Sequence, residues 1–146
     1  MYTRNFDAVT GPEALVIGDD ILLSFEVFQD DLVVDADGDY VSGTPQDVTT
    51  WTLAFYVRKN DKATGAPLIG KVSGAGIAIT GTYNATHSMN TQRVEVTIAD
   101  TDTVQDDGTI LVAAGKYRHS LKRTNAGSEK TVADGKFVLL ERPVRV

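Results

Sequence analysis

Cysteine is absent from this chain of 146 residues. Its absence excludes disulfide bonds, zinc–thiolate sites, iron–sulfur clusters and a cysteine nucleophile. Histidine is scarce as well, and with only His87 and His119 a metal site built from several imidazoles is not expected. No apolar run approaches the roughly 18–20 residues that cross a bilayer, and residues 1–7 lack the basic region and apolar core of a signal peptide. We therefore expect a protein made in the cytoplasm, with no membrane contact.

Basic residues are outnumbered, with 14 Lys and Arg against 20 Asp and Glu and a formal net charge of −6. This balance argues against direct nucleic-acid binding, which needs excess positive charge to neutralise phosphates. The imbalance lies in residues 1–50, which hold eleven acidic residues and one basic residue, whereas 51–146 is mildly basic. The acidic third could pair with the basic remainder, within one fold or between copies, or both could simply be solvated.

Alternating apolar and polar residues recur along the chain with the period of β-strands. Valine and threonine, which suit a pleated surface, occur 17 times each, and no segment has a helical period over three turns. We therefore predict an all-β fold, a single antiparallel β-sandwich of about seven to nine strands. An amino-terminal arm is expected at 1–13, the sandwich at 14–141 and an extended carboxy-terminal tail at 142–146.

The strands expected to bury one face are 21–27, 51–57, 93–98, 116–123 and 136–140. Weaker strand candidates are 14–17, 32–35, 39–41, 67–72, 77–79 and 130–133, and a short helical turn is expected near 101–107.

Asp35, Asp37 and Asp39 match the first, third and fifth positions of an EF-hand-like calcium loop. Their hard carboxylate oxygens suit a hard cation. The rest of the loop departs from the pattern, because Tyr40 stands where the turn requires glycine and Gln46 replaces the closing glutamate. The favoured interpretation is a hairpin that turns at the Asp-Gly step within this cluster. A weak calcium site is the alternative, and no cofactor is otherwise predicted.

Basic side chains occupy one face of the strand expected at 116–123. Lys116, Arg118 and Lys122 alternate with residues of the buried face. Such a row could bind an anionic partner, including the acidic third of a second copy, or form cross-strand ion pairs on a solvated sheet.

An enzymatic role has little support in the sequence. His119 is expected at the edge of the core rather than in catalysis, and no Gly-x-Ser-x-Gly nucleophile motif is present. We expect no enzymatic activity, and a small hydrolase that uses His119 or His87 is the minor alternative.

The order of the segments points to a family. Gly18-Asp-Asp20 precedes the first strong strand, and the most distinctive part is Tyr117-x-x-x-Leu121 followed by Gly127 and Gly135-x-Phe137. This succession resembles small immunoglobulin-like β-sandwich modules of tailed-phage virions, over roughly residues 15–140. Such modules occur as stand-alone structural proteins and as attachment domains of baseplate and tail-fibre proteins. The resemblance implies an immunoglobulin-like fold and a role in virion structure.

From this resemblance we expect a bacteriophage virion structural protein, made in the host bacterial cytoplasm. It would assemble in the tail, neck or baseplate and fibre-attachment region, with other virion proteins as partners and as a homo-oligomer or symmetric assembly. The alternatives are a head-decoration (cement) protein on the capsid and a carbohydrate-binding module with Tyr40, Tyr56 and Tyr83 as an aromatic platform. The expected interface residues are Tyr2 and Phe6 in the arm, Val144 and Val146 in the tail, and Lys116, Arg118 and Lys122.

Overall fold

The computed structural model of the chain describes residues 2–5, 15–60, 65–125 and 128–141. Over these ranges the protein is all-β, as predicted, and its helical segments are two short 3-10 turns. No helix in the described part of the chain has the length and apolar character needed to cross a membrane. The elements are β1 (Tyr2–Asn5), β2 (Leu15–Val16), β3 (Ile21–Phe28), β4 (Val33–Val34), β5 (Tyr40–Ser42), β6 (Leu53–Arg58), β7 (Ile69–Ser73), β8 (Gly76–Thr80), η2 (His87–Met89), β9 (Arg93–Ile98), η3 (Asp100–Asp102), β10 (Gly115–Asn125) and β11 (Ser128–Leu140).

The predicted strands are confirmed, and so is the helical turn, which is η3. One difference lies near the carboxy-terminal end, where the segments 130–133 and 136–140 form a single strand, β11. The strand continues because Asp134 and Gly135 pair with Ser120 and His119 of β10.

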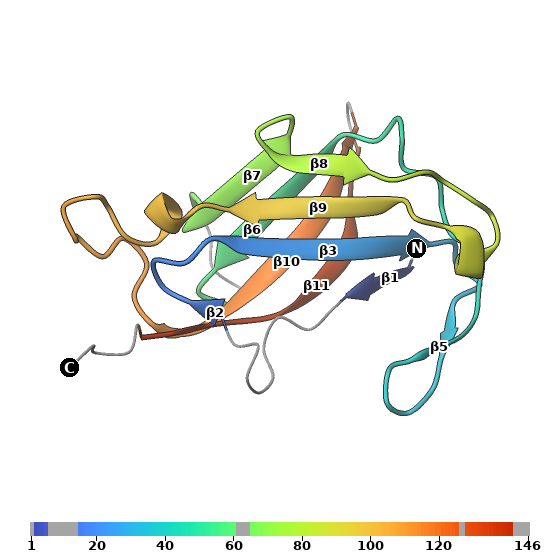
Figure 1. Cartoon of the computed structure of the whole chain (residues 1–146), viewed down its shortest axis with the longest axis horizontal. Coiled ribbons are helices and arrows are strands. Elements are labelled where there is room, and N and C mark those ends of the chain that lie inside the picture. Colours follow the sequence, from blue (N-terminus) through green and yellow to red (C-terminus); the bar gives the residue numbers. More distant parts are fainter. Residues whose placement is uncertain (1, 6–14, 61–64, 126–127, 142–146) are drawn as a thin grey trace.

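Nine strands form one sheet in the order β1-β3-β9-β8-β7-β6-β10-β11-β2, and β4 and β5 form a separate pair. Most neighbours are antiparallel, but β7–β8 and β11–β2 are parallel. Since β1 also lies beside β11, the sheet curls until its two ends nearly meet (Figure 1). The structure thus corrects the predicted simple antiparallel sandwich, because the sheet is mixed and continuous. Alternation along one strand indicates which side chains are buried but not which strands pair, so the sequence could not reveal this topology.

The core lies between the two halves of the curled sheet. Phe25 of β3 and Phe55 of β6 are fully buried with ring centroids 6.5 Å apart, so the β3–β9 half packs directly on the β6–β10 half. His119 is 2% exposed and its ring centroid lies 5.6 Å from that of Phe55, which places it deeper than the core edge expected. Burying each large apolar side chain contributes roughly 1.5–3 kcal/mol.

The end of β3 departs from simple alternation. Glu26, Val27 and Phe28 are all buried, so both faces of the strand are covered there. Directly after β3 the chain leaves the main sheet and forms the β4–β5 hairpin, which projects from the body (Figure 1). The covered strand end therefore supports the base of a protruding element.

Candidate functional site

The β4–β5 hairpin turns at the acidic cluster, which confirms the hairpin interpretation. The backbone N–H groups of Asp37 and Asp39 each donate to Asp35 Oδ1 at 2.9 Å, and the N–H of Gly38 donates to the Asp35 carbonyl at 3.0 Å. Gly38 has φ +82°, a left-handed conformation that favours glycine. The Asp35 side chain therefore organises the turn, while Asp37 and Asp39 are exposed.

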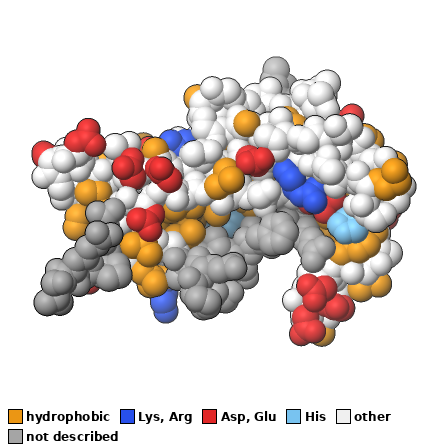
Figure 2. Space-filling view, viewed as in Figure 1, with side chains coloured by type: hydrophobic (Ala, Val, Ile, Leu, Met, Phe, Trp, Pro, Cys, Tyr) orange, Lys and Arg blue, Asp and Glu red, His pale blue; other side chains and the backbone are white. Residues whose placement is uncertain are grey.

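The surface of the hairpin combines apolar sides with an acidic tip. Val33 and Val41 are 50% and 56% exposed. One carboxylate oxygen from each of the three aspartates lies within 4.8 Å of the others, so weak calcium binding stays a prediction for this cluster. In Figure 2 the acidic groups gather on a projection at the lower right, beside hydrophobic side chains. Exposed valines beside carboxylates are suited to contact another protein surface.

The base of the hairpin is tied together by polar contacts. The N–H and hydroxyl of Thr44 donate to the Asp31 carboxylate at 3.0 and 2.7 Å, and these bonds hold the pKa of Asp31 below the ordinary value of an aspartate. Gly43 lies so close to Leu32 that an added Cβ would sit 2.9 Å from the Leu32 Cα. The two legs of the hairpin are thereby fixed at their base.

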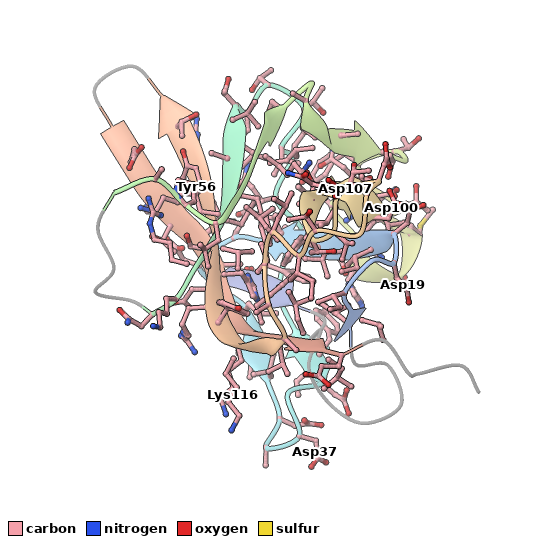
Figure 3. All side chains as sticks on the ribbon, turned by 90° about the vertical axis from the view of Figure 1, so that its left-hand side faces the viewer. Asp19, Asp37, Tyr56, Asp100, Asp107 and Lys116 are labelled. Atoms are coloured by element: carbon pink, nitrogen blue, oxygen red, sulfur yellow. The ribbon has the colours of Figure 1, made fainter. Side chains whose placement is uncertain are left out.

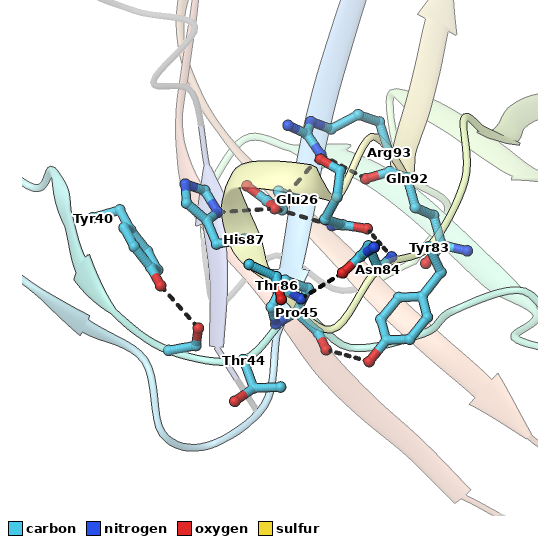
Figure 4. Close-up of polar contacts among 12 residues, drawn as sticks. Glu26, Tyr40, Thr44, Pro45, Tyr83, Asn84, Thr86, His87, Gln92 and Arg93 are labelled. Carbon is cyan, nitrogen blue, oxygen red and sulfur yellow. Dashed lines mark hydrogen bonds and ion pairs between the residues drawn. The ribbon is translucent and has the colours of Figure 1, made fainter.

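A buried carboxylate anchors the hairpin to the body (Figure 4). Glu26 Oε2 lies 3.1 Å from Nδ1 of His87 and accepts from Nδ2 of the buried Asn90 at 3.0 Å, with an Arg93 guanidinium nitrogen 3.6 Å away. The His87 ring in turn stacks on Tyr40 of β5, with centroids 3.8 Å apart. Strict alternation would place Glu26 on the solvent side of β3, so sequence reasoning missed this cluster.

A basic groove lies on the outer face of β6, β10 and β11. Arg58 of β6 is the direct register partner of Arg118 on β10, and Lys122 follows further along β10. These three side chains, with Asn60, His119, Ser120, Thr131 and Asp134, line a hollow of about 420 Å³. The structure thus brings together two of the three predicted basic interface residues and adds Arg58, which only the strand pairing could identify.

The remaining predicted interface residues are not brought to this groove. Lys116 is exposed and pairs with Val138 of β11, but it does not line the hollow. Tyr2 lies in β1 and pairs through its backbone with Phe28 of the same chain. Phe6, Val144 and Val146 lie outside the described residues.

The tyrosines considered for glycan binding are held by different elements. Tyr40 stacks on His87 and donates its hydroxyl to the Gly43 carbonyl at 3.0 Å, and Tyr83 donates to the Pro45 carbonyl at 3.0 Å. Tyr56 lies on β6, with the Arg58 guanidinium 5.0 Å from its ring centroid. In Figure 3 Tyr56 is well separated from Asp37 at the hairpin tip. This arrangement differs from the single platform that the carbohydrate-binding alternative requires.

Comparisons of the chain with protein-family models, curated proteins and solved structures find no match.

Proposed function

We propose that this chain is a structural protein of bacteriophage virions that assembles through protein–protein contacts in the tail, neck or baseplate and fibre-attachment region. The observation that carries the proposal is the β4–β5 hairpin, which combines exposed valines with a firm anchor. Val33, Val34 and Val41 are 50%, 42% and 56% exposed on a two-stranded element outside the main sheet. An isolated two-stranded hairpin is only marginally stable, so the Tyr40–His87 stack and the Glu26 cluster hold in place a projection that has little core of its own.

The fold assignment that we propose within the all-β class is immunoglobulin-like. Phe25 and Phe55 pack against each other across the core, as inward-facing residues of the two sheets do in an immunoglobulin-like sandwich. We infer that the curled sheet is a variant of that architecture in which the edges are joined. The resemblance of the segment order to virion modules then favours a phage particle as the place of assembly.

Quantitative mass spectrometry of purified phage particles tests the proposal by counting this chain against the major capsid protein. About six or twelve copies per particle, the numbers that ring symmetry generates, would support the tail, neck or baseplate region. Copies on the order of hundreds would instead indicate head decoration on an icosahedral shell. Absence of the chain from particles that carry the capsid protein would refute the proposal.

A further inference from the structure

We propose that the acidic β4–β5 hairpin of one copy docks into the basic groove on β6, β10 and β11 of a second copy. This inference rests on the proposed assembly role and specifies the two surfaces that would meet.

The groove has the chemistry of an anion-binding surface. Arg58 and Arg118 are directly opposite on neighbouring antiparallel strands, and like charges in that position repel. Lys122 adds a third cation to the same lining. An anionic group placed between these side chains would relieve the repulsion and receive charge-assisted hydrogen bonds.

Two acids near the groove, among the residues that the structure describes, are exposed and loosely held. Asp134 lies 3.9 Å from Arg118 and Glu129 lies 3.8 Å from Lys122, and these carboxylate side chains are 66% and 61% exposed. Exposed pairs of this kind contribute about 0–1 kcal/mol each. A partner that supplies several carboxylates at once could therefore displace them at little cost.

The hairpin complements the groove in charge. The segment 30–42 contains five aspartates and no Lys, Arg or His, and Asp37 and Asp39 are exposed at its tip. The groove volume of about 420 Å³ lies toward the small end of the roughly 300–1,000 Å³ typical of binding pockets, which suits the tip of a hairpin. Next to β6, Val72 on β7 is 47% exposed and offers an apolar contact for the hairpin valines.

The two surfaces cannot meet within one molecule. In Figure 3 Asp37 and Tyr56 lie on different sides of the protein, and Tyr56 pairs with Ser120 of the groove lining. The Tyr40–His87 stack also holds the hairpin against the η2 side of the body. The contact is therefore between copies and heterologous, since it joins two different surfaces, and repetition of such a contact generates a ring or a filament.

Reciprocal charge reversal in the full chain tests the contact. The hairpin variant is Asp37→Lys with Asp39→Lys, which spares Asp35 because its carboxylate organises the turn. The groove variant is Arg118→Glu with Lys122→Glu. A control variant, Asp106→Lys with Glu141→Lys, changes the net charge as the hairpin variant does, at exposed positions of other segments. Circular dichroism establishes that each variant is folded, and sedimentation velocity measures association at low and high salt.

We expect the wild-type chain and the control variant to associate at low salt, and each charge-reversed variant alone to associate at least about tenfold more weakly. An equimolar mixture of the hairpin and groove variants should recover association, because each supplies the surface that complements the other. Association that is unchanged in both variants would refute the hairpin–groove contact. It would mean that the copies associate through another surface. A wild-type chain that stays monomeric at low salt would also refute it, whereas the copy number in phage particles decides the proposed function independently.

Discussion

The imidazole ring of His87 stacks on the phenol ring of Tyr40, with centroids 3.8 Å apart and planes inclined by 22°. Through this contact a 3-10 turn between β8 and β9 holds a strand of the projecting hairpin. Phe28, at the end of β3, extends the stack, since its centroid lies 5.6 Å from Tyr40 and 5.5 Å from His87. The orientation of the hairpin therefore depends on three aromatic rings from three separate segments.

Replacing His87 should loosen the hairpin more than it destabilises the whole fold. His87→Ala removes the ring stack and the contact with Glu26, and we expect a loss of about 1 kcal/mol in the free energy of unfolding. Hydrogen exchange should become faster in residues 33–42 while the protection of β3 and β9 is retained. Met89→Ala is the matched control in the same turn, because the Met89 side chain is 66% exposed. Equal exchange in both variants would show that the stack does not hold the hairpin.

Removing the buried carboxylate should be more costly. Glu26→Leu leaves the amide of Asn90 without its acceptor and removes the acidic partner of His87 and Arg93. Breaking a fully buried pair costs about 3–5 kcal/mol. Since His87 and Arg93 are partly exposed, we expect about 2–3 kcal/mol, measured by urea denaturation. Glu129→Ala, which removes an exposed carboxylate, should change stability by about 0–1 kcal/mol. Equal losses in the two variants would contradict an anchoring role for Glu26.

The protein should lose stability in acid through its hydrogen-bonded aspartates. Hydrogen bonds from the Thr49 hydroxyl and N–H and from Gln92 hold the pKa of Asp47 below its ordinary value. Because the folded pKa is the lower one, the stabilisation is complete above the unfolded pKa, about 3.9. It disappears as the pH falls from there through the folded pKa.

Urea denaturation between neutral pH and pH 2 measures this dependence. In Asp47→Asn the decline in unfolding free energy below about pH 4 should be shallower than in the wild type. In Thr49→Ala, which lacks the hydroxyl donor, an NMR titration should find the Asp47 pKa closer to its ordinary value. If the unfolding free energy falls equally steeply below about pH 4 in Asp47→Asn and in the wild type, the Asp47 carboxylate does not contribute to the loss of stability in acid.

Neighbouring positions on β3 should respond very differently to truncation. Phe25 is 1% exposed and contacts Phe55 and His119, so Phe25→Ala should cost about 3–5 kcal/mol through lost burial and a cavity. Leu22 is 60% exposed on the other face, and Leu22→Ala should stay within about 0.5 kcal/mol of the wild type. Thermal unfolding compares the two. A similar melting temperature for both would contradict the core position of Phe25.

Local pattern was sufficient to predict the described strands other than β1 and most of the core, because burial of one strand face leaves a period of two in the sequence. Trp51, Leu53, Phe55 and Val57 are buried as that period predicts. The hairpin at Asp35–Asp39 was also predictable, since Asp and Gly favour tight turns.

The relations between strands could not be predicted in this way. The parallel pairing of β11 with β2 joins residues more than a hundred positions apart and leaves no local signal. For the same reason Arg58 could not be assigned to the groove, since its proximity to Arg118 arises from the register of β6 on β10. Glu26 could not be predicted to be buried either. The alternation of β3 assigns this charged residue to the solvent face, and only the position of the segment that carries His87 and Asn90 shows that this face is covered.

The near-closure of the sheet has a consequence for how the chain acquires its structure. β1 lies beside β11, and β2 pairs with β11, so strands from the two ends of the sequence complete the sheet together. Contacts between distant residues are slow to form. During synthesis, residues 128–140 must leave the ribosome before β2 has its partner, and until then the edge of β10 remains open. Closure is therefore a late event after translation of β11, and loss of that strand by premature termination would leave an intermediate prone to aggregation.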